Sequence, residues 1–218
     1  STLSSSSAAS DVYKRQLHSI VAEMPITFSF CRADLEEIAR GFLARQRKPI
    51  FRGVCGAVDG ILIKVHCPTP AEYPKPAQFY TRKQYYALNV QAVVDAKRRF
   101  LFLSMDCPGS VHDSTAFQAS ALGQHQRRLP SGYYLLGDPA YKAHPRVLTP
   151  FEGRARMESG WKANFSFFHS SLRMSVECAF GMLVQRWGCL WRPLRSSLRH
   201  NILACLLYTS DAADEEDS

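Results

Sequence analysis

Long hydrophobic runs are absent from this 218-residue chain, so no membrane span, which needs about 20 apolar residues, is expected. The serine-rich beginning contains no apolar stretch of the kind found in secretory signal peptides, and we expect none. Closely spaced cysteine pairs are also lacking among the seven cysteines. A disulfide framework and a zinc site are therefore not expected, and we interpret the cysteines as reduced core residues of an intracellular protein.

Acidic side chains are scarce in the middle of the chain. The whole sequence carries 27 Lys and Arg against 19 Asp and Glu, a formal charge of +8. Residues 1–16 hold two basic residues and one acid and residues 208–218 hold five acids, so the remainder has 25 basic and 13 acidic side chains, or +12. Such a surplus favours a polyanionic partner, because each Lys or Arg on a phosphate releases counterions. A basic protein without such a partner is the alternative.

Both ends of the chain differ in composition from the rest. Residues 1–16 are rich in serine and residues 208–218 are acidic. Both resemble translated sequencing-adapter sequence and are excluded from the fold, although disordered tails would have a similar composition. We expect a helical lead-in over residues 17–50 and one domain over residues 51–207, truncated at its carboxyl end.

Apolar periodicity predicts a domain that mixes strands and helices. Strand-like runs cover residues 51–58, 61–67, 85–95, 100–106 and 133–136. Helical patterns cover residues 32–46, about 114–122 and, most clearly, about 170–191. The intervening residues 151–168 are typical of a basic loop. This order favours an α/β fold with a mixed sheet flanked by helices.

Four acidic residues in short distinctive blocks carry most of the functional signal. They are Asp59, Asp113, Asp138 and Glu177. Carboxylates within apolar patterns are costly to bury unless a cation holds them. Two divalent metal ions are one such holder, because they activate water and stabilise the leaving oxygen in phosphodiester cleavage. Magnesium prefers oxygen ligands and keeps several waters, so three or four carboxylates suffice.

Each of these acids also has a structural alternative. Asp59 lies in an Asp-Gly pair between apolar runs, which is typical of a hairpin turn. Asp113 could cap a helix, and Asp138, in an Asp-Pro pair, could start a turn. Glu177 follows Arg173 by four residues and could form a surface ion pair with it.

Several motifs follow one another in a recognisable order. They are GAVDG (56–60), RK (82–83), YALNVQAVVD (86–95), PGSVHDS (108–114), LGDPAY (136–141), LTP (148–150), NF (164–165), HS (169–170) and VECAFG (176–181). Over residues 32–205 the chain resembles the PIF/Harbinger-type transposases and the nucleases derived from them, of the DDE superfamily. The resemblance implies a ribonuclease-H-like mixed sheet flanked by helices.

The resemblance also implies a site and a reaction. The acidic triad would be Asp59, Asp138 and Glu177, with Asp113 as a fourth metal ligand; which aspartate is the second triad member stays open. The cofactor would be a divalent metal, Mg²⁺ or alternatively Mn²⁺, and the reaction would be hydrolysis of DNA, with strand transfer in a complete transposase. Nuclear localisation, with the cytoplasm as an alternative, and an oligomer are further expectations.

Candidate DNA contacts lie in the same motifs as the acids. Arg82, Lys83 and Arg173 are the candidate phosphate contacts, since Arg binds phosphate through two hydrogen bonds. His112 and His169 are interpreted as structural ahead of a role in proton transfer. No Myb-like module is visible, so the resemblance implies a Myb-like companion protein for target recognition. The rival hypotheses are a catalytically silent DNA- or protein-binding module and a fragment of a decayed element.

Overall fold

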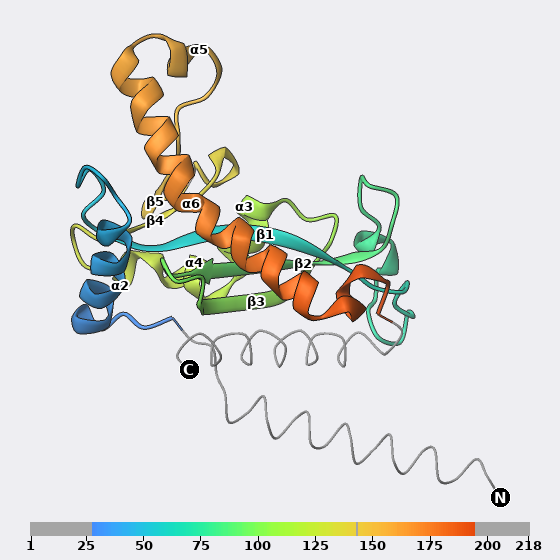
Figure 1. The fold of residues 1–218 in the computed structure, drawn as a ribbon. Helices are drawn as coiled ribbons and strands as arrows, with labels where there is room; N and C mark the ends of the chain where they lie inside the picture. The colour runs from blue at the N-terminus through green and yellow to red at the C-terminus, as the bar shows by residue number, and fades with distance from the viewer. Residues whose placement is uncertain (1–27, 143, 195–218) are drawn as a thin grey trace, which may run out of the picture.

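A five-stranded mixed sheet forms the centre of the molecule (Figure 1). The computed structural model describes residues 28–142 and 144–194. The strands are β1 Val54–Lys64, β2 Ala87–Val94, β3 Phe100–Pro108, β4 Tyr134–Leu136 and β5 Val147–Leu148, in the order β3-β2-β1-β4-β5. The first three form an antiparallel meander, whereas β4 pairs parallel with β1 and β5 parallel with β4. The expected α/β fold with a ribonuclease-H-like sheet is confirmed.

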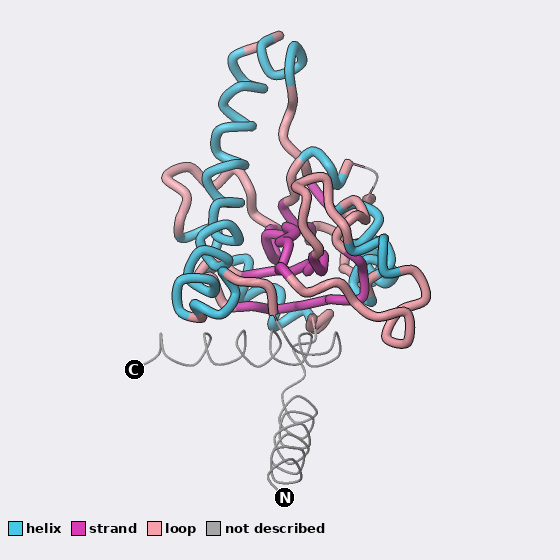
Figure 2. The backbone as a smooth tube through the Cα atoms, turned by 90° about the vertical axis from the view of Figure 1, so that its right-hand side faces the viewer, coloured by secondary structure: helices cyan, strands magenta, loops and turns pink. Residues whose placement is uncertain are grey.

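Helices lie on both sides of the strands (Figure 2). They are α2 Arg32–Ala44, α3 Asp113–Ala119, α4 Ala121–His125, α5 Gly153–Met157 and α6 Gly160–Arg186, with 3-10 turns η1 Pro76–Phe79, η2 Gln126–Arg128, η3 Pro139–Tyr141 and η4 Gly188–Trp191. In Figure 1 the long α6 crosses the near face of the sheet diagonally and extends beyond it to α5, while α2 lies beside the sheet at the left. The sheet is thus covered by α6 on one face and by α3 and α4 on the other.

Alternation along the strands divides the core into two clusters, because successive side chains point to opposite faces. Ile63 of β1 and Val90 of β2 pack with Val176 of α6 in one cluster. Val58 of β1 packs with Phe117 of α3 in the other. From Ala57 onward the odd-numbered positions of β1 therefore face α6 and the even-numbered positions face α3, whereas before the irregularity between Val54 and Ala57 the order is reversed.

One continuous strand replaces the two strand-like runs predicted over residues 51–58 and 61–67. Within β1, Asp59 pairs with Ala92 and Gly60 with Gln91 in an antiparallel ladder, so the hairpin alternative for Asp59 is wrong. The glycine serves close packing instead of a turn, because a Cβ at Gly60 would lie 2.3 Å from Oδ1 of Asp113.

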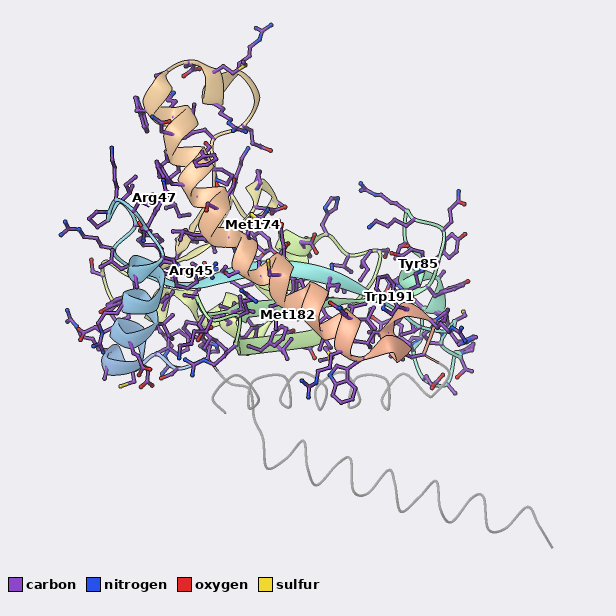
Figure 3. The ribbon with its side chains drawn as sticks, in the orientation of Figure 1. Arg45, Arg47, Tyr85, Met174, Met182 and Trp191 are labelled. Atoms are coloured by element: carbon purple, nitrogen blue, oxygen red, sulfur yellow. The ribbon has the colours of Figure 1, made fainter. Side chains whose placement is uncertain are left out.

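The prediction of a basic loop over residues 151–168 is also wrong, because α5 and the start of α6 lie there. The first turns of α6 bury Ser166 and His169 and leave Trp161 and Phe167 exposed, so they lack apolar periodicity. Further along α6, Met174 and Met182 are exposed on the outer side of the helix (Figure 3). The helical pattern at about 114–122 forms two helices, α3 and α4.

Cysteine burial departs from the prediction as well. Among the cysteines whose side chains are described, all free thiols, Cys55 is buried, whereas Cys31, Cys67 and Cys178 are exposed and Cys107 is intermediate. They are therefore mostly not core residues. No helix within residues 28–142 and 144–194 is long and apolar enough to cross a membrane. The adapter-like segments 1–16 and 208–218 lie outside the described residues.

Candidate active site

Asp59 and Asp138 follow equivalent positions of two adjacent parallel strands. Ala57 of β1 pairs with Leu136 of β4, and each aspartate comes two residues later. Asp59 lies within β1, while Asp138 lies just past β4 and caps η3, where its Oδ1 accepts a hydrogen bond of 2.9 Å from the amide of Ala140. The turn predicted at Asp138 is present, and it directs this residue to the same level of the sheet as Asp59.

The pKa values of these aspartates are raised, which indicates that the positive charge of Arg173 does not fully offset burial and the neighbouring carboxylates. The pKa of the Asp59 carboxyl is raised from 3.8 to about 6: burial is the main cause, the charges of Asp138 and Asp113 add to it, and the Gly60 amide and Arg173 oppose it. Burial is also the main cause that raises the pKa of Asp138, and Asp113 again adds to it. Mutual repulsion among three aspartates is the setting in which a bound divalent cation stabilises most.

Arg173 joins the acid of the sheet to the acid of α6. Its Nη1 donates to Oδ2 of Asp59 at 3.1 Å and its Nη2 donates to Oε1 of Glu177. The side chains of Arg173 and Asp59 are 17% and 20% exposed, whereas Glu177 is 47% exposed. The pair predicted between Arg173 and Glu177 is therefore present, but it extends inward to β1 and is not confined to the surface.

Asp113 reaches the site from α3 and is held by two amides of β2. Nδ2 of Asn89 and Nε2 of Gln91 donate to its Oδ1 at 2.9 and 3.1 Å. The hydroxyl of Tyr141 donates to Oε1 of Gln91 at 2.7 Å. The capping alternative for Asp113 is wrong, because His112 is the N-cap and Asp113 is the first residue of the helix.

Tyr141 is part of this network, and it is fully buried. Burial, followed by the charges of Asp113, Asp59 and Asp138, raises the pKa of its phenol far above the usual value. The phenol therefore remains a proton donor to Gln91 at physiological pH.

A groove of about 430 Å³ adjoins Asp113. Its walls include Gly60, Arg82, Lys83 and His112. Both Arg82 and Lys83 are exposed, and Nη2 of Arg82 lies 2.9 Å from Nε2 of His112. The volume is within the range of about 300–1,000 Å³ typical of ligand sites. Two of the three predicted phosphate contacts thus lie beside Asp113, and the third, Arg173, lies beside Asp59.

Buried histidines near the site serve the fold. Nε2 of His169 lies 2.8 Å from the carbonyl oxygen of Leu148, and burial lowers the pKa of this histidine. Its Nδ1 has no hydrogen-bond partner within the described residues. His144, which sequence reasoning missed, is buried against Phe117, and burial lowers its pKa too. The interpretation of His169 as structural fits this environment.

The amides of β2 are the other residues that sequence reasoning missed. Asn89 and Gln91 are only 2% and 1% exposed in a strand that is otherwise apolar. The sequence does contain a signal for them: two amide residues at alternate positions of an apolar strand. Because buried amides need hydrogen-bond partners, this pattern indicates a polar group nearby.

The donor set suits a hard divalent cation in its chemistry. Asp59, Asp113 and Asp138 offer carboxylate oxygens, which Mg²⁺ and Mn²⁺ prefer. Across the part of the chain that the structure describes, no three His, Cys, Asp or Glu side chains are already arranged to hold a metal ion. The guanidinium of Arg173 instead neutralises part of the negative charge.

Comparisons with known proteins show the family to which the chain belongs. Residues 58–209 match the model of the DDE superfamily endonuclease family. "Protein ALP1-like" of Arabidopsis thaliana is 27% identical over 181 residues, covering 75% of this chain and 44% of its own length. "Putative nuclease HARBI1" of Rattus norvegicus is 31% identical over 160 residues, covering 70% and 44%, and its Homo sapiens counterpart is 27% identical over 162 residues, covering 70% and 44%.

The chain spans less than half the length of these relatives. No solved structure matches it. The assignment rests on both sequence and fold, because the family model covers more than half of the chain and the fold is a mixed sheet flanked by helices. The chain belongs to the DDE superfamily endonucleases and is related to the nucleases derived from Harbinger transposases.

Proposed function

We propose that this chain is the nuclease domain of a Harbinger-type transposase or of a protein derived from one, and that it hydrolyses phosphodiester bonds of DNA with a divalent metal. The carrying observation is the position of Asp59 and Asp138 after paired residues of adjacent parallel strands. Glu177, joined to Asp59 through Arg173, completes the proposed triad. Membership of the DDE superfamily supports nuclease chemistry in general.

The proposed metal site uses carboxylates from β1, from the turn that follows β4 and from α6. Bound Mg²⁺ or Mn²⁺ would supply an activated water and stabilise the leaving oxygen. Asp59, Asp138 and Glu177 would hold the metal, with Asp113 as the fourth ligand. We favour Asp138 as the second triad member, because one oxygen of Asp113 already accepts two amide hydrogen bonds.

Hydrogen bonds from neighbouring residues would orient these carboxylate ligands. With a pKa of about 6, Asp59 is ionised at neutral pH; its Oδ1 accepts a hydrogen bond from the amide of Gly60 and its Oδ2 one from Arg173. Asn89 and Gln91 fix the orientation of Asp113, and Tyr141 fixes Gln91. Rigid support of this kind keeps ligands within the narrow geometry that catalysis requires.

DNA would lie along the groove beside Asp113. Arg82 and Lys83 would bind its phosphates from the groove wall, and Arg173 would act closer to the carboxylates. The positive charge of the chain supports a polyanionic substrate. For the whole protein we further propose nuclear localisation, oligomerisation, strand transfer and a Myb-like companion that recognises the target sequence.

A nicking assay tests the proposal. The purified full-length chain is incubated with supercoiled plasmid in Mg²⁺, in Mn²⁺ and in EDTA. We expect nicking only with metal, and its loss in Asp59→Asn and Asp138→Asn with DNA binding retained. Asp106→Asn, an exposed aspartate of β3 bonded to Ser104, is the matched control and should nick normally.

A catalytically silent DNA- or protein-binding module is the second candidate. It is favoured by the lack of a ready-made three-ligand group among the described residues. It predicts DNA binding by the wild-type chain without nicking in either metal. Nicking that persists in Asp59→Asn would contradict both candidates and would indicate a contaminating nuclease.

A further inference from the structure

The guanidinium of Arg173 occupies oxygens that the proposed metal site needs. One of its nitrogens donates to Oδ2 of Asp59 and the other to Oε1 of Glu177. The two acids belong to elements far apart in the sequence, β1 and α6. Arg173 is therefore the polar link that ties the α6 carboxylate to the sheet.

This contact is a strong one for an ion pair so close to the surface. Arg173 and Asp59 are largely shielded from water, at 17% and 20% exposure, so solvent screens their attraction less than that of surface pairs. Both hydrogen bonds are charge-assisted, and the planar guanidinium contacts the two carboxylates at once. Removing one partner would leave another carboxylate buried without its cation.

A second property of arginine determines what can release the contact. The guanidinium remains protonated at every physiological pH, so it cannot give up the carboxylates by losing its proton. A competing cation with higher charge can displace it. The exposure of Glu177, 47%, leaves an open side toward which the displaced side chain can turn.

We propose that Arg173 is a latch: its guanidinium holds Asp59 and Glu177 together while the site is metal-free, and it must leave them when a divalent cation binds. The inference rests on the proposed function, since it assumes that these carboxylates are metal ligands. It has a measurable consequence. Metal binding has to break the latch, so the latch weakens the apparent metal affinity.

Direct metal binding to the full-length chain tests the latch. Calorimetric titration with Mn²⁺ and melting temperatures in EDTA and in saturating Mg²⁺ are compared for wild type, Arg173→Gln and Arg173→Lys. We expect Arg173→Gln to bind Mn²⁺ about fivefold or more tightly than wild type, the usual lower range of coupling between two sites. It should also melt at a lower temperature than wild type in EDTA, and metal should narrow that gap.

Two further variants separate the latch from simpler effects. Lys162→Gln removes one positive charge from the same helix, where Lys162 pairs with Glu158 and not with the site. It should change Mn²⁺ affinity less than about twofold, since Lys162 lies roughly 16 Å from Arg173 along α6, at about 1.5 Å per residue, and charges are screened over roughly 10 Å. Arg173→Lys keeps the charge but loses the simultaneous contact with two carboxylates. It should bind Mn²⁺ more tightly than wild type. This variant replaces Arg173→Gln in the test if Arg173→Gln fails to fold.

The outcomes distinguish failure of the latch from failure of the metal site. Equal Mn²⁺ affinity in wild type and the Arg173 variants, or equal gains in Arg173→Gln and Lys162→Gln, overturns the latch alone. Weaker binding in the Arg173 variants also overturns it and makes Arg173 a scaffold for the ligands. If wild type binds Mn²⁺ no better than Asp59→Asn does and Mg²⁺ does not raise its melting temperature, both the proposed metal site and the latch are overturned.

Discussion

The charge of Asp59 connects the chemistry of the site with the stability of the domain. In the unfolded chain its carboxyl loses a proton near pH 3.8, whereas in the fold burial raises the pKa to about 6. Ionising Asp59 within the folded protein therefore costs about 3 kcal/mol at neutral pH, at 1.36 kcal/mol for each pH unit between the two values. The domain retains this unfavourable charge at a position where a catalytic carboxylate is proposed, which is common at functional sites.

Asp59→Asn tests this cost through its pH dependence. Because the folded-state pKa is raised, wild type is most stable relative to the variant below pH 3.8, and it loses that advantage as pH rises to about 6. We expect the variant to gain about 3 kcal/mol relative to wild type between these values and nothing more above them. Urea unfolding in EDTA at pH 4 to 8 measures the difference, and a difference that does not change with pH would contradict a raised pKa for Asp59 in the folded protein.

Tyr141→Phe tests the network that holds Asp113. The substitution removes the donor to Oε1 of Gln91 and leaves that buried oxygen unpaired, so we expect a loss of about 1–3 kcal/mol in unfolding free energy. Metal-dependent nicking should fall as well, because Gln91 helps to orient Asp113. Tyr80→Phe, at a tyrosine that is 48% exposed, should change stability by less than about 0.5 kcal/mol.

At the scale of the elements, local apolar periodicity predicted most helices and strands, whereas contacts between distant parts of the chain could not be predicted from it. The helix expected over residues 32–46 is α2, and the strands expected over residues 85–95, 100–106 and 133–136 are β2, β3 and β4. The start of α6 was missed because its first turns bury polar Ser166 and His169. Periodicity identifies an apolar face and gives no signal where the buried face is polar.

In the candidate site, too, local motifs identified residues but not the contacts between them. The four acids were identified from their blocks, and the sheet places Asp59 and Asp138 after paired positions. The contact of Arg173 with Asp59 spans 114 positions and could not be predicted from spacing. The same holds for the amides that hold Asp113, because a sequence does not specify which side chains meet across elements.

Gly60→Ala tests how closely β1 and α3 must approach. A Cβ at this position would lie 2.3 Å from Oδ1 of Asp113 and 2.5 Å from Nε2 of Gln91, so both side chains must shift. We expect a stability loss of about 1–3 kcal/mol and a larger relative loss of nicking, since the displaced groups belong to the site. Gly181→Ala in α6 meets no atom within 4 Å and should raise stability by up to about 1 kcal/mol. Equal effects of the two variants on nicking would contradict the proposed role of Asp113.

At the scale of the whole molecule, basic residues are spread widely along the chain. The proposed site predicts which of them contact the phosphates of DNA. Two exposed pairs of adjacent Arg and Lys residues lie outside the strands, one at 82–83 and one at 47–48. Arg82 and Lys83 line the groove beside Asp113, close in sequence to Tyr85, whereas Arg47 and Lys48 follow α2. In Figure 3, Tyr85 and Arg47 lie at opposite ends of the molecule. The pairs therefore separate local phosphate contact from the general effect of net charge.

The salt dependence of DNA binding distinguishes these two effects. Each phosphate contact contributes about 0.9 to the slope of log K against log salt concentration for duplex DNA. The double variant Arg82→Gln/Lys83→Gln should therefore lower the slope by about 2, measured by fluorescence anisotropy with a labelled duplex and Ca²⁺ in place of Mg²⁺. The double variant Arg47→Gln/Lys48→Gln, with the same loss of charge, should change it by less than about 0.5 because it removes no contact. Equal changes would mean that DNA binds through the overall charge of the domain, and the groove beside Asp113 would then not be where the substrate lies.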